Sequence, residues 1–326
     1  MIDAAIVGLG WWGKSIVKAV QGKSDRLRFI RGVSKEPESV RDFAAQYDFQ
    51  TVSELDAALA DPRVQAVVLA TPHSLHPGQV VAAAQAGKPV FCEKPLALTR
   101  AEALRAVRAC AAAGVTLGLG TNKRFWPSMR ELRRMVASGA LGRTLYIEGN
   151  SSNANSGQFF APWRDLDAEA PGGGMTGPGL HMLDALVSLG GPLRRVTARL
   201  VTHKPAPDPL DAVSVLVDFA SGISGSLAAV RATPFYWRVH VFGETGSAEA
   251  LGENDLVLHR AGQAPTRQSF ASVDSLRAEL DAFADAVAGR SPYPLATAEM
   301  LDVVAGFEAI IASLRSEAPA AVALAD

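Results

Sequence analysis

Residues 8–13 of the chain read GLGWWG and stand between an apolar run at residues 4–7 (AAIV) and a segment with helical spacing at residues 14–20 (KSIVKAV). A continuous apolar run is typical of a buried parallel strand, and apolar residues three or four positions apart are typical of a helix. Three glycines with this spacing between a strand and a helix form the fingerprint of a dinucleotide-binding turn. The stretch therefore predicts a doubly wound α/β domain at the start of the chain.

Each glycine of this turn is expected to have a separate structural role. Gly8 makes the tight turn, Gly10 lets the backbone approach a pyrophosphate, and Gly13 lets the helix pack closely on the strand. The helix N-terminus adds N–H groups and a positive dipole end for the phosphates. An ordinary glycine-rich turn is the alternative, but the strand–helix context favours a cofactor site. The expected cofactor-binding residues here are Gly8, Gly10, Trp11, Trp12 and Gly13.

The end of the second expected strand bears on the choice of cofactor. NAD-specific sites usually place an acidic residue there to bind the ribose hydroxyls. Here the strand at residues 27–33 is followed by Ser34 and Lys35, which can bind a 2′-phosphate. We therefore expect NADP, or both NADP and NAD; the nearby Glu36 leaves NAD open.

Composition and cysteine content limit the possible partners. The chain has 326 residues, 48% hydrophobic and 20% charged, so two domains with sizeable cores are expected. The net charge of −1 removes the main electrostatic argument for binding nucleic acid. We expect neither a membrane span nor a signal peptide. Cys92 and Cys110 form no CxxC pair, so two buried thiols in the cytoplasm, a reducing compartment, are expected.

The first domain is expected to comprise residues 1–120, in which strand-like and helix-like segments alternate. Such alternation predicts a parallel sheet with helices on both faces. Thr99 is expected to cap the last helix and Gly114 to end it. The expected strands are residues 4–8, 27–33, 66–70, 89–92 and 116–119, and the expected helices are residues 14–21, 37–47, 52–60, 76–86 and 100–113.

The second domain, residues 121–326, is expected to be an α/β domain with a large open, mostly antiparallel sheet. Residues 150–174 are polar and glycine-rich and predict a long loop that selects the substrate. Residues 318–326 are expected either to fray or to form a last strand. Strands are expected at residues 144–149, 195–202, 211–219, 223–230, 237–243 and 247–251, and helices at 127–138 and 179–189. Two closing helices, at 275–288 and 299–316, are candidates to pack back on the first domain.

Two polar runs follow neighbouring expected strands of the first domain. Residues 70–76 (ATPHSLH) and residues 93–95 (EKP) therefore lie at the carboxyl ends of parallel strands, where such sheets bind ligands. A partly desolvated Lys94 can hold a substrate oxygen and favour its developing negative charge. A surface lysine in a β–α turn is the alternative. Pro95 restricts the backbone beside Lys94 and is a candidate for a cis peptide bond.

A second candidate site lies at residues 171–184 (PGGGMTGPGLHMLD). His181 and Asp184 are three residues apart on one expected helix and so share a face. A histidine beside a carboxylate can exchange a proton near neutral pH. A core histidine with a satisfied hydrogen bond is the alternative. A metal site at His73 and His76, or at His181 and Asp184, lacks a tight multi-ligand pattern, and none is predicted.

Together these pieces make the whole chain resemble the Gfo/Idh/MocA family of oxidoreductases. The matching motifs are GLGWWG (8–13), ATPHSLH (70–76), GKPVFCEKPLALT (87–99), NKRFWPSMRELRRMVASGALG (122–142) and GGGMTGPGLHMLD (172–184), in family order and with family spacing. The resemblance implies a Rossmann domain and a second domain whose open sheet often mediates oligomerisation. It also implies NAD(P)-dependent oxidation or reduction of a sugar, cyclitol or related polyol.

The resemblance also implies roles for single residues. Lys94 and His181 match the family's catalytic lysine and helix histidine. Thr176 and Asp184 are the other expected substrate-binding groups, and many members have an aspartate where this chain has Gly177. Positions matching the nicotinamide side of the cofactor are Thr71, Pro72, His76 and Glu93, and Arg124 matches an arginine near cofactor and substrate.

The expected function is therefore a cytoplasmic NAD(P)-dependent dehydrogenase or reductase of a carbohydrate-like alcohol or ketone, active as a homodimer or homotetramer. Lys94 would bind the reacting oxygen and His181 would exchange its proton with solvent. One alternative is a reductase of a non-sugar carbonyl with the same fold. The other is a cofactor-dependent sensor without turnover, which Gly177 favours and which the retained Lys94 and His181 oppose.

Overall fold

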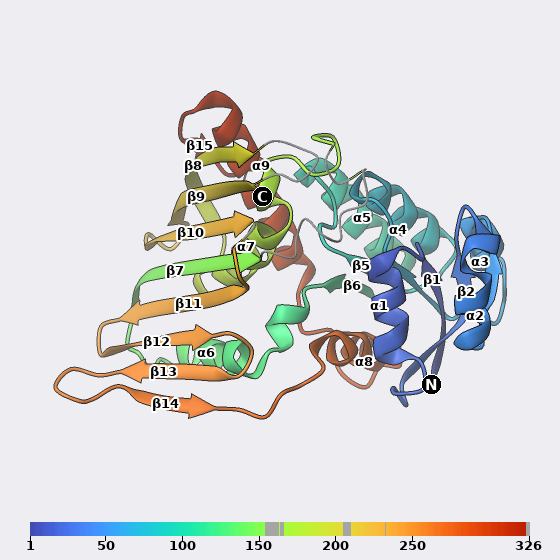
Figure 1. Ribbon diagram of the computed structural model, residues 1–326, viewed down its shortest axis with the longest axis horizontal. Coiled ribbons are helices and arrows are strands. Elements are labelled where there is room, and N and C mark those ends of the chain that lie inside the picture. The colour runs from blue at the N-terminus through green and yellow to red at the C-terminus, as the bar shows by residue number, and fades with distance from the viewer. Residues whose placement is uncertain (154–162, 164–165, 205–209, 232, 324–326) are drawn as a thin grey trace. The chain divides into compact units, whose positions relative to one another are not determined.

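The structure is a computed structural model that describes residues 1–153, 163, 166–204, 210–231 and 233–323. The chain divides into two compact units. The first comprises Met1–Asn122 and Asp274–Met300, and the second comprises Lys123–Val273 and Leu301–Asp326. Each unit is built on one sheet (Figure 1).

The first unit contains a parallel sheet with strand order β3-β2-β1-β4-β5-β6 (Figure 1). This order reverses between β1 and β4, and it is the doubly wound order of dinucleotide-binding domains. The predicted fold of this part is confirmed. Its strands are β1 (Ile2–Val7), β2 (Leu27–Val33), β3 (Gln50–Val52), β4 (Ala66–Leu69), β5 (Val90–Glu93) and β6 (Leu117–Gly120). Its helices are α1 (Trp11–Val20), η1 (Pro37–Val40), α2 (Arg41–Gln46), α3 (Leu55–Leu59), η2 (His73–Leu75), α4 (His76–Gln85), α5 (Arg100–Ala113) and α8 (Ser275–Val287).

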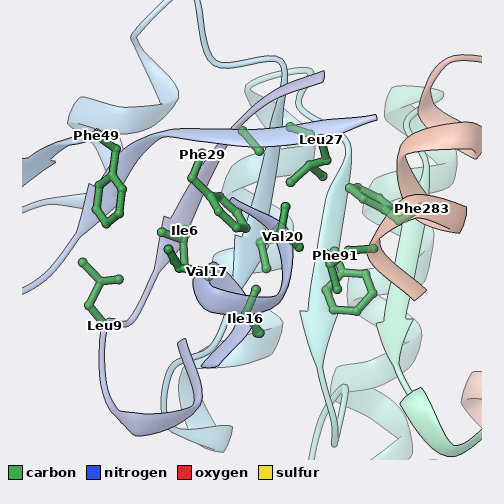
Figure 2. Close-up of a cluster of buried hydrophobic side chains, with 14 of the residues drawn as sticks. Ile6, Leu9, Ile16, Val17, Val20, Leu27, Phe29, Phe49, Phe91 and Phe283 are labelled. Atoms are coloured by element: carbon green, nitrogen blue, oxygen red, sulfur yellow. The ribbon is translucent and has the colours of Figure 1, made fainter. Parts of the chain in front are cut away.

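One hydrophobic cluster holds this unit together, and it includes side chains from distant parts of the chain (Figure 2). Ile6 of β1, Ile16 of α1 and Phe29 of β2 are fully buried in it. Phe283 of α8 joins them and packs edge-on against Phe91 of β5, with ring centroids 5.6 Å apart. The burial of such side chains contributes roughly 1.5–3 kcal/mol each, so α8 is an integral part of this core.

The second unit contains a nine-stranded sheet with order β14-β13-β12-β11-β7-β10-β9-β8-β15 (Figure 1). Among the described residues, the β7–β10 pair is parallel and the other pairs are antiparallel, which confirms a mostly antiparallel sheet. α7 packs against β7 and β10, and α6 packs against β12 and β13. The strands are β7 (Thr144–Asn153), β8 (Leu193–Lys204), β9 (Leu210–Phe219), β10 (Ser224–Arg231), β11 (Tyr236–Gly243), β12 (Gly246–Leu251), β13 (Asp255–His259), β14 (Thr266–Ser269) and β15 (Ala320–Ala321). The helices are α6 (Pro127–Ala137), η6 (Gly173–Met175) and α7 (Pro178–Gly190); η3 (Asn122–Phe125) and α9 (Thr297–Ser316) cross the limits between the units.

Several local predictions are confirmed and others are wrong. The Thr99 side chain accepts a hydrogen bond from the Glu102 N–H, and Gly114 ends α5 with φ +65°. The helix predicted at residues 52–60 starts later, at Leu55, because residues 50–52 pair with β2 as β3. β7 continues to Asn153, so residues 150–153 of the predicted loop belong to a strand, and residues 154–162 and 164–165 lie outside the described residues.

Candidate functional site

The glycine turn between β1 and α1 has little room for side chains. Gly8 has φ +91°, and a Cβ there would lie 2.6 Å from the Ala70 carbonyl oxygen. A Cβ at Gly13 would lie 1.9 Å from the carbonyl oxygen of Gly8, far inside van der Waals contact. A Cβ at Gly10 would meet nothing within 4 Å. The first and third glycines are therefore required by the fold, and the second leaves an open approach to the backbone.

The surroundings of this turn fit a dinucleotide. The Gly8 N–H donates to the Val33 carbonyl (3.0 Å), and the Ala70 N–H donates to the Val7 carbonyl (2.8 Å). These bonds hold the turn at the carboxyl ends of β1, β2 and β4, beside the point where the strand order reverses. The N-cap residue of α1 is Gly10, so no N-cap side chain binds the first turn of the helix. The N-terminus of α1 therefore presents backbone N–H groups to a ligand.

The predicted aromatic pair of the turn divides into an exposed and a partly buried ring. The Trp11 side chain is 51% exposed at the start of α1. Trp12 packs against the hydrophobic cluster of the unit, and the two ring centroids are 5.3 Å apart. Trp11 is thus the ring of this pair that a bound molecule reaches more easily.

The end of β2 presents Ser34 and Lys35, as the sequence indicates. The Ser34 N–H donates to the Val52 carbonyl (3.0 Å), and the Ser34 hydroxyl accepts from the Glu36 N–H (3.3 Å). Lys35 is exposed. The binding of a 2′-phosphate by these two residues stays a prediction.

The segments that follow β4 and β5 are linked by buried polar contacts. Glu93, the last residue of β5, is 6% exposed, and its carboxylate accepts from the Lys94 N–H (3.3 Å). Lys94 itself is half-buried, and the Lys94–Pro95 peptide bond, a candidate for the cis form, is cis. A Cβ at Gly120 of β6 would lie 2.7 Å from Glu93 Oε1, so a side chain at this position would displace the carboxylate.

The run after β4 is held to α4. The Thr71 hydroxyl donates to Gln79 Oε1 (2.6 Å), and Pro72 precedes the short η2 helix. His76, the first residue of α4, is fully buried. Its Nδ1 lies 2.7 Å from the Pro95 carbonyl oxygen and its Nε2 lies 3.0 Å from that of Thr71.

The second unit pairs two of the predicted site residues with each other. Arg124 of η3 and Asp184 of α7 have side chains 4% and 6% exposed and form three hydrogen bonds. Arg124 Nε lies 3.0 and 2.8 Å from the two carboxylate oxygens, and its terminal nitrogen lies 2.7 Å from Oδ1. This pair fixes η3 to α7, so both side chains have a structural partner. Their contact with cofactor or substrate stays a prediction.

Thr176 and His181 differ in their exposure. Thr176 is 1% exposed, and its hydroxyl donates to the Pro171 carbonyl. Gly177 precedes α7 without a side-chain cap, and a Cβ there would meet nothing within 4 Å. His181, in the first turns of α7, is half-buried. His181 is therefore more accessible than Thr176.

Two clusters of polar and aromatic side chains in the second unit are absent from the predicted site residues. Asp211 of β9 is bound by the Arg231 guanidinium and also accepts from the Gly174 N–H (3.1 Å), which anchors the glycine run before α7. The Lys123 ammonium lies 4.3 Å from the ring centroid of Trp237 and 5.1 Å from that of Trp126. Residues far apart in sequence build both clusters, so no local pattern indicates them.

The two thiols are buried and free. Burial raises the pKa of the Cys92 thiol well above its ordinary value and raises that of Cys110 to about 11. Neither thiol is therefore ionised near neutral pH. Within the part of the chain that the structure describes, no three His, Cys, Asp or Glu side chains are grouped as metal ligands. Of the helices described, none combines the length and apolar character that crossing a bilayer requires.

These features define a class of protein. The order of the first sheet, the restricted glycines at its switch point and the open helix N-terminus are those of a dinucleotide-binding α/β protein with a second sheet domain. The family model described as "Oxidoreductase family, NAD-binding Rossmann fold" matches residues 2–121, and that of the "GFO/IDH/MocA C-terminal domain" matches residues 129–249. The chain belongs to the GFO/IDH/MocA oxidoreductase family, which confirms the resemblance.

The chain is also similar to several named relatives and solved structures. The chain is 29% identical over 58% of its length to the 2,7-anhydro-N-acetylneuraminate hydratase of Escherichia coli strain K12. It spans about half, 50–51%, of the length of that protein and of two similar relatives. It is 27% identical to the inositol 2-dehydrogenase 1 of Saccharopolyspora erythraea, over 88% of this chain and 86% of the relative. A levoglucosan dehydrogenase in complex with NADH and L-sorbose has the same fold, with a TM-score of 0.88, 23% identity and 99% of each chain covered.

Proposed function

We propose that the protein is an NAD(P)-dependent dehydrogenase or reductase of a sugar, inositol or related polyol or ketone. The observation that carries the proposal is the glycine turn, where Gly8 and Gly13 have no space for a side chain and Gly10 is open. Such a turn is needed where a backbone approaches a pyrophosphate. Family relatives named as inositol dehydrogenases support the substrate class.

Cofactor binding and substrate binding are assigned mainly to different parts of the chain. Residues 1–120 provide most of the cofactor contacts and residues 121–326 most of the substrate contacts, while α8 packs with the first part. A bound nicotinamide supplies or accepts the hydride. The Lys94 ammonium donates to the reacting oxygen and stabilises negative charge that develops there, and His181 exchanges that oxygen's proton with solvent. We assign cofactor contacts to the remaining predicted residues Gly8, Gly10, Trp11, Trp12, Gly13, Ser34, Lys35, Thr71, Pro72, Glu93 and Arg124, and substrate contacts to Thr176 and Asp184. His76, also predicted at the cofactor, is fully buried and supports Thr71 through its backbone contact.

NADP is the proposed preferred cofactor, with NAD as the weaker one. The support is the exposed Lys35 beside Ser34 at the end of β2, where NAD-specific domains usually carry an acid. Isothermal titration with NADPH and NADH tests this preference. Tighter binding of NADPH is expected, and Lys35→Ala is expected to weaken it while leaving NADH unchanged. A clear preference of the wild type for NADH would refute the assignment.

A turnover assay distinguishes the proposed dehydrogenase from the two alternatives, a reductase of non-sugar carbonyls and a sensor without turnover. Wild-type protein is mixed with NADP or NAD and a panel of sugars, inositols and non-sugar carbonyls, and cofactor oxidation state is followed by absorbance. Turnover of a sugar or inositol supports the proposal, and turnover only of non-sugar carbonyls supports the first rival. Cofactor binding without turnover of any compound supports a sensor, the function that Gly177 favours.

We also propose a homodimer or homotetramer that forms through the open face of the second unit's sheet. Leu216 of β9 is 64% exposed on this face, and Val201 of β8 is 39% exposed. Strands β7 to β11 surround a hollow of about 490 Å³ there. Leu216→Glu is expected to lower the mass measured by light scattering, whereas an unchanged mass would exclude this face. The free thiols Cys92 and Cys110 support a cytoplasmic location.

A further inference from the structure

His76 is the most completely enclosed titratable ring in the first unit. It begins α4, has 0% exposure, and has a backbone carbonyl oxygen within hydrogen-bond distance of each ring nitrogen. The Pro95 oxygen lies 2.7 Å from Nδ1 and the Thr71 oxygen lies 3.0 Å from Nε2. Both distances lie within the range of about 2.7–3.2 Å that is usual for an N–H···O hydrogen bond.

The chemistry of the two acceptors decides the protonation state of the ring. A carbonyl oxygen carries lone pairs and no hydrogen, so it only accepts. A neutral imidazole has a single N–H, and its second nitrogen would turn a lone pair toward a carbonyl lone pair. Only the imidazolium has an N–H on both nitrogens and satisfies both contacts of His76.

The two acceptors belong to the segments that follow adjacent strands. Thr71 follows β4, and Pro95 follows β5 and is bonded directly to Lys94. Gln79, one turn further along α4, holds the Thr71 hydroxyl as well (2.6 Å). The His76 ring therefore bridges the backbone that carries Lys94 to the backbone at the end of the neighbouring strand.

We infer that His76 is held as an imidazolium that donates to Thr71 and Pro95, and that it is a positioning residue for Lys94. The role of Lys94 toward substrate rests on the proposed function, but the bridge itself does not. The titratable and charged groups near the bridge include the His73 ring, whose centroid is 5.9 Å from that of His76, and Glu93 and Lys94, which directly precede Pro95 in the chain. Burial and the N-terminal end of the α4 dipole both oppose a positive charge at His76. The two carbonyl acceptors must therefore outweigh both effects for the ring to keep its second proton.

Nitrogen NMR of the wild-type protein tests the protonation state. The chain has 6 histidines, so ¹⁵N-histidine labelling and through-bond assignment resolve the His76 ring. At about pH 8, above the ordinary titration range of histidine, we expect two ring N–H groups on His76. Their exchange with water should be at least about 10²-fold slower than that of the exposed His203, because the ring is buried. A neutral ring with one N–H at this pH would overturn the inference.

A second measurement tests the effect on Lys94. ¹³Cε-lysine labelling gives separate signals, and Lys94→Ala identifies the one of interest. His76→Gln is expected to shift the Lys94 signal and to leave that of Lys123, in the second unit, unchanged. An unmoved Lys94 signal would refute the positioning role. If His76→Gln does not fold, a pH titration of the wild-type protein replaces it. The positioning role then predicts that the Lys94 signal shifts at the pH where the His76 ring loses its second proton. Neither spectrum depends on turnover or on bound cofactor.

Discussion

Removal of the Asp184 carboxylate is expected to destabilise the second unit strongly. Asp184 and Arg124 are 6% and 4% exposed and share three hydrogen bonds of 2.7–3.0 Å. Asp184→Ala leaves the guanidinium buried without its carboxylate. Breaking a buried pair in this way costs about 3–5 kcal/mol. For a unit of this size each kcal/mol lowers the melting temperature by roughly 2–4 °C, so a fall of about 6–20 °C is expected.

Thermal and urea unfolding of the full chain, followed by circular dichroism, measure this loss. The matched control is Glu244→Ala, which removes one partner of the Arg143–Glu244 pair, whose side chains are 76% and 47% exposed. An exposed pair contributes about 0–1 kcal/mol, so this variant should melt within a few degrees of the wild type. The reasoning is refuted if Asp184→Ala melts no lower than Glu244→Ala.

Three further outcomes are expected. Gly13→Ala should weaken cofactor binding at least about 10-fold in isothermal titration, because its Cβ would meet a backbone oxygen at 1.9 Å, whereas Gly78→Ala, in open space on α4, should bind normally. His181→Asn should lower kcat by roughly 10²–10⁴-fold and flatten the pH–rate profile near neutrality; an unchanged profile would make His181 structural. Cys92 and Cys110 keep their protons in the fold, since burial raises the pKa of Cys110 to about 11 and that of Cys92 well above 9.0. Between about pH 9 and about pH 11 these two thiols bind fewer protons in the unfolded chain than in the folded one. The free energy of unfolding, measured in urea, should therefore fall as the pH rises through this range.

Much of the first unit could be predicted because its signals are local. The strand predicted at residues 27–33 has the observed extent of β2, and the one predicted at residues 66–70 exceeds β4 by one residue. The Thr99 cap and the Gly114 stop correctly predicted the two ends of α5. The short β3 was missed, since a three-residue edge strand has no period of its own and exists only through its pairing with β2.

The second unit was harder to predict because its sheet depends on pairing between distant segments. β13 and β14 alternate weakly and have few fully buried residues, so no apolar pattern indicates them. The same limit applies to the site. The sequence places Arg124 and Asp184 on separate elements, and only the fold shows that they neutralise each other. It likewise cannot show that both His76 nitrogens meet carbonyl oxygens.

The central claim, an NAD(P)-dependent oxidoreductase whose Lys94 holds the reacting oxygen, is tested most directly by comparing wild type and Lys94→Ala in the sugar and inositol screen. Cofactor affinity is measured on both proteins by isothermal titration. The account predicts turnover of at least one polyol by the wild type, a loss of roughly 10²-fold or more in kcat for Lys94→Ala, and nearly equal cofactor affinity. Undiminished turnover by Lys94→Ala, or cofactor binding by the wild type with no polyol turned over, would contradict it.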